Sequence, residues 1–94
     1  MSTYIMFGKY STDALKGINS KRTIKGNALV NKLGGKVISS YAMLGDKDLV
    51  LIADFPDIEQ AMKASISLSK LTDIAFSTAP AVTVEEFDKI MTKV

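Results

Sequence analysis

The 94-residue chain contains no cysteine, no histidine and no tryptophan. Without cysteine it can form neither a disulfide nor a thiolate nucleophile, and without both cysteine and histidine it has no Cys/His zinc site. The absence of histidine also excludes a Ser-His-Asp triad and a histidine-ligated haem. The remaining residues contain no P-loop, no dinucleotide fingerprint and no metal-ligand cluster. We therefore expect no metal and no cofactor.

Long apolar runs are also missing. No segment approaches the ~18 apolar residues that a membrane-spanning helix needs. The first ten residues lack the basic region and long apolar core of a secretory signal. We expect a cytoplasmic protein, with which the absence of cysteine is compatible. Apolar residues make up 47% of the chain and charged residues 23%, which at this length is typical of one globular domain covering 1–94.

Charge is distributed unevenly along the chain. Residues 1–36 hold seven basic residues and one acidic residue, a net charge of +6, whereas residues 37–94 hold five basic and nine acidic residues, a net charge of −4. Such a chain could bind an anion at one end or pack basic halves on acidic halves of neighbouring copies. The charges could equally belong to solvated helix faces. Nucleic-acid binding is not favoured, because the few aromatic residues do not interleave with the basic ones.

Period-two alternation and turn signals predict four strands, at 2–9, 36–44, 49–55 and 74–79, the last ended by Pro80. The first strand places Tyr4, Met6 and Gly8 on one face and Ile5 and Phe7 on the other. In the second strand, the alternation assigns one face to the residues Val37, Ser39, Tyr41 and Met43. The Gly45–Asp48 segment has the composition of a turn, which makes the second and third strands a hairpin.

Three helices are predicted between and after these strands. The first begins at Ser11 or Thr12, is interrupted near Asn19-Ser20, and ends at Gly34-Gly35. Its apolar stripe consists of Ile24, Ala28, Leu29 and Leu33. The second begins at Pro56-Asp57, and its buried stripe consists of Ile58, Ala61, Met62, Ser65 and Leu68. The third follows a Thr83–Glu86 capping box, with Phe87, Ile90, Met91 and Val94 on one face.

The order β-α-β-β-α-β with an extra C-terminal helix predicts an α+β, ferredoxin-like plait, in which helices cover one face of an antiparallel sheet. The third strand, LVLIADF, is apolar on both faces and should be covered on both. In so short a chain a second copy is needed to cover the other sheet face. We therefore expect a homodimer or higher homo-oligomer that associates through its sheet faces.

Four segments carry a resemblance to a known family: TYIMFGKYSTDALKGI, NKLGGKV, MLGDKDLVLIADFPD and EEFDKIM. Together they span nearly the whole chain and resemble the small bacterial and archaeal GYD domain proteins. The family's Gly-x-Tyr-Asp signature corresponds to Gly45, Asp46, Lys47 and Asp48, with Lys47 in place of the tyrosine. The resemblance implies a dimeric α/β barrel of ferredoxin-like type, and it implies no established biochemical activity.

The signature turn supplies the first candidate ligand-binding residues, Gly45, Lys47 and Asp48. The Asp48 carboxylate could lie at the mouth of a pocket, where Lys47 could pair with it or with an anionic ligand. Alternatively, Gly45 adopts a positive φ and Asp48 accepts hydrogen bonds from backbone N–H groups in the turn.

The other candidates are the three tyrosines, Tyr4, Tyr10 and Tyr41, and the basic pair Lys21 and Arg22. A pocket tyrosine could orient a small substrate, or these rings could pack on the pleated sheet with the hydroxyl at its rim. Lys21 and Arg22 lie in the first turn of the resumed helix, where cations oppose the helix dipole. Such an arrangement can mark an anion site, unless the helix continues through 19–20 and the pair lies in its middle.

Three functions follow from these features. An oligomeric small-molecule-binding or regulatory module fits the small residues of the second helix and the lack of a catalytic constellation. A cofactor-independent monooxygenase or isomerase acting on a small aromatic or unsaturated substrate is the alternative, by analogy of fold. An assembly protein, whose role is its oligomer, would use the charge asymmetry. We favour the binding module and leave open whether the protein is an enzyme.

Overall fold

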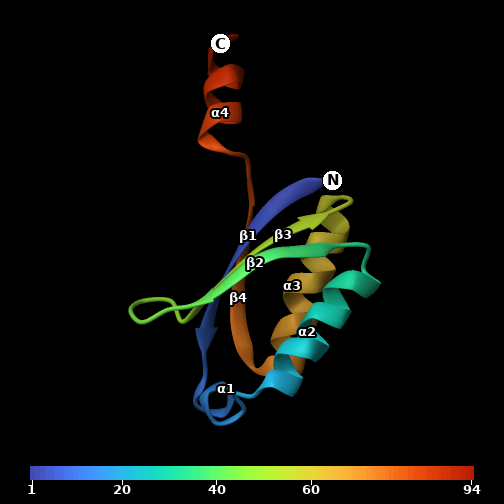
Figure 1. The fold of residues 1–94 in the computed structure, drawn as a ribbon, viewed down its shortest axis with the longest axis vertical. Coiled ribbons are helices and arrows are strands. Elements are labelled where there is room, and N and C mark those ends of the chain that lie inside the picture. Colours follow the sequence, from blue (N-terminus) through green and yellow to red (C-terminus); the bar gives the residue numbers. More distant parts are fainter.

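A four-stranded antiparallel sheet forms the centre of the molecule, and α2 and α3 lie together on one face of it (Figure 1). The computed structural model describes residues 1–94. The elements are β1 (Ser2–Tyr10), α1 (Thr12–Lys16), α2 (Ser20–Lys32), β2 (Lys36–Ala42), β3 (Leu49–Phe55), α3 (Ile58–Thr72), β4 (Ile74–Ala81) and α4 (Val84–Met91). The strand order β2-β3-β1-β4 is that of the ferredoxin-like plait, so the predicted fold class is confirmed.

The pairing register separates an inner sheet face from an outer one. Tyr4 pairs with Ala53 and Met6 with Leu51, and these residues point toward the helices. Alternate residues therefore lie on the outer face, where Ile5 pairs with Ile52 and Phe7 with Val50. No helix covers the outer face, so this apolar surface is open.

Local signals in the sequence begin each helix where expected. The side chains of Asn19, Asp57 and Thr83 accept hydrogen bonds from the backbone N–H three residues later, at 2.9, 2.9 and 3.1 Å respectively. Ser11 caps α1 in the same way. The interruption near Asn19-Ser20 is complete: two separate helices form, because Asn19 begins a new helix instead of continuing the old one.

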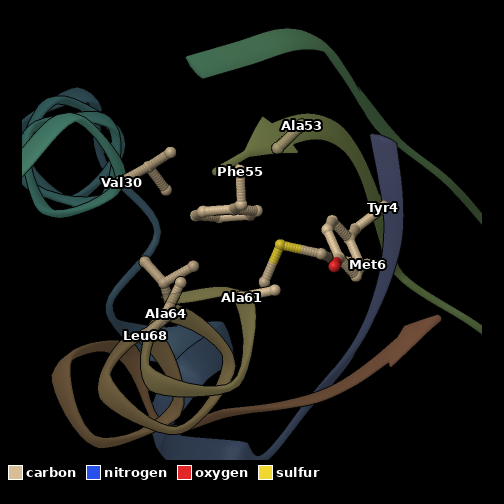
Figure 2. Packing of buried hydrophobic residues seen from close by; sticks show 8 residues of the cluster. All are labelled: Tyr4, Met6, Val30, Ala53, Phe55, Ala61, Ala64 and Leu68. Carbon is tan, nitrogen blue, oxygen red and sulfur yellow. The ribbon is translucent and has the colours of Figure 1, made fainter. Parts of the chain in front are cut away.

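Phe55 is the centre of the hydrophobic core, as Figure 2 shows. Its fully buried ring lies between the sheet and both long helices and meets Tyr4 edge to face, with centroids 5.8 Å apart. The rest of the cluster consists of Met6, Val30, Ala53, Ala61, Ala64 and Leu68. These residues come from β1, β3, α2 and α3, so this end of the molecule is closely packed.

Hydroxyl groups join α3 to the edge strand β4. Thr78 Oγ1 donates to Ser65 Oγ at 2.9 Å, and the backbone N–H of Phe76 donates to Ser69 Oγ at 3.3 Å. Thr72 Oγ1 accepts from the N–H of Ile74 at 3.2 Å. The small residues of α3 thus allow the helix to approach the sheet closely.

The predicted buried stripes of both long helices are partly wrong. Ala61, Ser65 and Leu68 are buried, but Ile58 and Met62 are 59% and 63% exposed. They lie on the face of α3 that is turned away from Ala61, Ala64 and Leu68, the residues with which the helix packs on the core. On α2, Ile24 is 67% exposed, because the helix turns Thr23, Gly26, Asn27 and Val30 toward the sheet instead.

Two strand predictions also need correction. The register between β2 and β3 shifts between Val37 and Ser39, so Val37 shares its face with Ser40 rather than with Ser39 and Tyr41. Pro80 does not end β4, which continues to Ala81. β4 is an edge strand, the position in a sheet where proline is tolerated because only one side of the strand has a hydrogen-bonding neighbour.

The C-terminal helix α4 stands apart from the rest of the chain, beyond the end of the sheet at the top of Figure 1. None of its residues is buried, and the apolar side chains of Phe87, Ile90 and Met91 are 43–50% exposed. The predicted amphipathic helix is present, but its apolar face has no partner within the same chain.

The tight approach of Gly35 to the core gives a test of this packing. A Cβ at position 35 would lie 2.6 Å from two ring carbons of Phe55 and 2.9 Å from the Asp54 carbonyl oxygen. We expect Gly35→Ala to lower the free energy of unfolding by about 1–3 kcal/mol, because the buried ring has no free space to move into. Thermal unfolding should show a drop of roughly 4–8 °C per kcal/mol for a domain of this size.

Gly26→Ala is the matched control. A Cβ there would lie 3.5 Å from Leu68 Cδ2, an ordinary contact, and alanine is favoured over glycine inside a helix. Its unfolding temperature should be unchanged or higher. A Gly35→Ala variant as stable as this control would contradict the described packing around Phe55.

Candidate functional site

A cavity of about 300 Å³ lies between α2 and the inner sheet face, at the end of the molecule away from Phe55. It is lined by residues of β1, α2, all three other strands and the last turns of α3. The lining residues are Tyr10, Ile18, Asn19, Arg22, Thr23, Gly26, Asn27, Val30, Ser40, Tyr41, Ala42, Leu49, Leu51, Leu68, Thr72, Ile74 and Phe76. The volume is at the lower end of the ~300–1,000 Å³ typical of small-molecule sites.

The cavity exists because small residues face each other across it. Gly26 on α2 lies opposite Ser40 and Ala42 on β2, so no large side chain fills the space between them. The deep wall is apolar: Val30, Leu68 and Ile74 are at most 3% exposed. Amide and hydroxyl groups of α2 and its N-cap, by contrast, lie toward the mouth.

Arg22 and Tyr10 form the charged side of this cavity. The Arg22 guanidinium lies over the Tyr10 ring, 5.4 Å from its centroid. Its Nη1 donates to the carbonyl oxygen of Ala14 at 2.6 Å, which ties α2 to the last turn of α1. The backbone N–H of Arg22 donates to Asn19 Oδ1, so three contacts hold this residue in place.

Asp48 supports Tyr10 from behind. Its Oδ2 accepts a hydrogen bond from the backbone N–H of Tyr10 at 2.8 Å and lies 3.8 Å from Lys9 Nζ. Its backbone N–H donates to the Gly8 carbonyl oxygen at 2.9 Å. Asp48 therefore anchors the β2–β3 turn to β1 and does not line the cavity.

The structure brings together only some of the predicted site residues. Tyr10, Arg22 and Tyr41 line the cavity, Tyr41 at its rim with 60% of its surface exposed. Tyr4 is buried in the core beside Phe55. Three further predicted residues lie outside the cavity. Gly45 lies in an open part of the β2–β3 turn with φ +137°, and Lys47 lies in the same turn and forms no ion pair. Lys21 lines a neighbouring polar depression.

Sequence reasoning missed the polar residues of α2 that line the cavity. Asn19, Thr23 and Asn27 recur every four residues, the spacing of one helix face, and with Gly26 and Val30 they form the inward surface of α2. Ranking helix faces by apolar content favoured Ile24 and Ala28. The four-residue recurrence of small polar residues was the available signal.

Two general properties bear on chemistry at this site. No group of three or more acidic side chains comes together where it could hold a metal ion. No helix has the length and apolar character needed to span a membrane.

Solved structures resemble the fold but not the sequence. The chain superposes on the leucine response regulatory protein of Mycobacterium tuberculosis with a TM-score of 0.58 and 7% identity, covering 88% of this chain and 51% of the regulator. An AsnC family transcriptional regulator from Agrobacterium tumefaciens gives a TM-score of 0.57 and 20% identity, over 86% and 50% of the two chains. This chain thus spans about half the length of each regulator, and the likeness shows a shared ferredoxin-like fold.

A search of curated protein sequences gives no significant match. The family is shown instead by a sequence model of the GYD domain, which matches residues 4–91. That match includes every strand but the first two residues of β1, both long helices and all of α4. The protein therefore belongs to the GYD domain family.

Proposed function

We propose that this protein is an oligomeric small-molecule-binding module whose ligand occupies the cavity between α2 and the sheet. The observation that supports this most directly is the cavity itself, which combines a buried apolar wall with polar side chains in the same lining. A regulatory role is consistent with the shared fold, because both structural neighbours are named as regulators. A cytoplasmic location stays a prediction from the sequence.

The cavity chemistry favours binding over catalysis. Tyr10 lines it from the inner sheet face, as a monooxygenase or isomerase would require, whereas Tyr41 pairs with Val50 on the outer face and lies only at the rim of the cavity. Its lining, however, contains no aspartate, glutamate or lysine, so a general base near neutral pH has no side chain to supply it. The Asp48 carboxylate accepts a hydrogen bond from the Tyr10 backbone and does not line the cavity, so it is not placed to act as the base.

The surface of the single chain supports the oligomeric part of the proposal. Its accessible area is 6370 Å², whereas a compact monomer of this mass exposes about 5,300 Å². The excess of about 1,000 Å² is comparable with the ~800 Å² that one partner contributes to a standard interface. Apolar side chains are exposed on the outer sheet face, where Phe7 and Tyr41 are 38% and 60% exposed, and on the unpartnered helix α4.

A face-to-face arrangement of two sheets would cover Ile5, Phe7, Val50 and Ile52 of each copy at once. An eight-residue helix such as α4 is marginal in water by itself, so its apolar face also needs a surface to pack on. Both features point to association with a second copy, which the sequence predicted through the sheet faces.

Filling the cavity tests the binding function. Gly26→Leu should place a leucine side chain inside the cavity, since the nearest atom to a Cβ there is Leu68 Cδ2 at 3.5 Å. Ligands would be sought with a metabolite panel by thermal shift on the full chain. A ligand at about a hundred times its Kd adds about 2.7 kcal/mol of stability, and Gly26→Leu should abolish that shift.

Ala28→Leu provides the control for this experiment, because Ala28 is exposed and lies outside the cavity on the same helix. This variant should respond to the ligand as the unaltered protein does. A ligand whose thermal shift survives in Gly26→Leu would bind elsewhere, and a panel without any stabilising compound would refute the binding function.

The oligomer can be tested on the outer sheet face. Phe7→Asp should convert the oligomer to a monomer at micromolar concentration, because the interface would then bury an unpaired carboxylate at a cost of several kcal/mol. Light scattering coupled to size-exclusion chromatography, at low and high salt, measures this. The unaltered oligomer should persist at high salt, since the interface is apolar.

Ile24→Asp introduces the same charge at an exposed isoleucine of α2, away from the outer sheet face. It should leave the oligomer intact. Unaltered protein that is monomeric in both salt conditions would rule out the sheet-face interface.

A further inference from the structure

We propose that the cavity binds a small monocarboxylate with an apolar body and no ammonium group, and that Arg22 holds its carboxylate. This inference rests on the proposed binding function and names the class of ligand. The inference depends on the charge of the cavity lining, in which Arg22 is the one charged side chain and no carboxylate is present.

Arg22 is a half-buried cation without a carboxylate partner. The ion pairs of the chain join Lys9 to Asp48, Lys63 to Glu59 and Lys89 to Glu85, and none involves Arg22. Of its five N–H donors, one is used by the Ala14 carbonyl oxygen. The planar guanidinium presents paired donors that match the two oxygens of a carboxylate, which suits it better than a lysine for this task.

The guanidinium is also fixed in position before any ligand arrives. Stacking on Tyr10 and the bond to Ala14 orient it, while the hydrogen bond from the Tyr10 backbone to Asp48 fixes the strand beneath it. A preorganised cation loses little side-chain freedom when an anion binds. Tyr10 and Asp48 act here as positioning residues.

The rest of the lining limits what the remainder of the ligand can be. The deep wall of Val30, Leu68 and Phe76 suits an apolar body. Asn27 and Thr23 also line the cavity and have side-chain donors for a polar group of the ligand. A ligand ammonium would find no aspartate or glutamate in the lining, so its desolvation would not be compensated.

A polar depression adjoins the cavity, and Arg22 lines both of them. Asp13 and Asp73 line that depression together with Arg22, Lys21 and Lys25. Neither carboxylate forms an ion pair with Arg22, and neither lines the cavity. One unpaired cation facing an apolar cavity favours a single negative charge rather than a phosphate dianion.

Matched probes test this inference on the 94-residue protein. We would measure the affinity of 4-methylpentanoate and 3-phenylpropanoate by calorimetry at neutral pH. The neutral probes are the corresponding amides. The zwitterionic probes are leucine and phenylalanine, which have the same carbon skeletons as the two acids and an added ammonium group. The acids should bind at least about tenfold more tightly than either comparison set, the factor expected when a charge-assisted hydrogen bond is lost or a charge is left unpaired.

Two substitutions connect the preference to Arg22. Arg22→Gln should remove the preference of acid over amide, and Arg22→Lys should retain only part of it because the paired donors are lost. Lys25→Gln removes the same charge one turn further along α2, outside the cavity, and should leave the preference unchanged. If Arg22→Gln fails to fold, the comparison of acids with amides in the unaltered protein and in Arg22→Lys still decides.

The outcomes separate this inference from the binding function. Amides that bind as tightly as the acids, with both blocked by Gly26→Leu, would overturn the role of Arg22 and leave the binding function standing. Leucine that binds as tightly as 4-methylpentanoate would overturn the exclusion of an ammonium group. Absence of binding by all probes would overturn the inference, whereas a different compound stabilising the protein through the cavity would preserve the function.

Discussion

The position of one aromatic ring decides how the helices sit on the sheet. Phe55 ends β3 and fills the space among Tyr4, Val30 and Ala61, so α2 and α3 are held close to the sheet at that end. The close approach of Gly35 leaves the ring no alternative position. Close packing of this kind makes that end of the molecule rigid, and the geometry of the other end follows from it.

At the other end no comparable side chain occupies the space beneath α2. Gly26, Ser40 and Ala42 are too small to fill it, and the helix N-cap brings Asn19 and Arg22 to its mouth instead. The result is a cavity with an apolar wall fixed by the core and a cation fixed by Tyr10 and Ala14. A site with an apolar wall and a cation at separate positions suits a molecule that has an apolar part and one polar end.

The chain leaves a large part of its apolar surface without a partner. Only 13 of its 94 residues are buried, and α4 contributes none of them. A small domain has a high ratio of surface to volume, so the core under the helices cannot include the outer sheet face as well. The proposed association of copies would cover that face, and it would leave open a cavity that lies on the opposite side of the sheet.

The sequence by itself determined the elements and their order. The alternation in β1, the continuous apolar run of β3 and the caps at Asn19, Asp57 and Thr83 depend on residues close together in the sequence, which the chain brings together whatever the fold. Tertiary structure alone decided which helix faces point inward, the shifted register of β2, the continuation of β4 through Pro80 and the isolation of α4. It also decided the site: Tyr10 at the end of β1 meets Arg22 in the first turn of α2, and the cavity is the space left between elements, which no local pattern encodes.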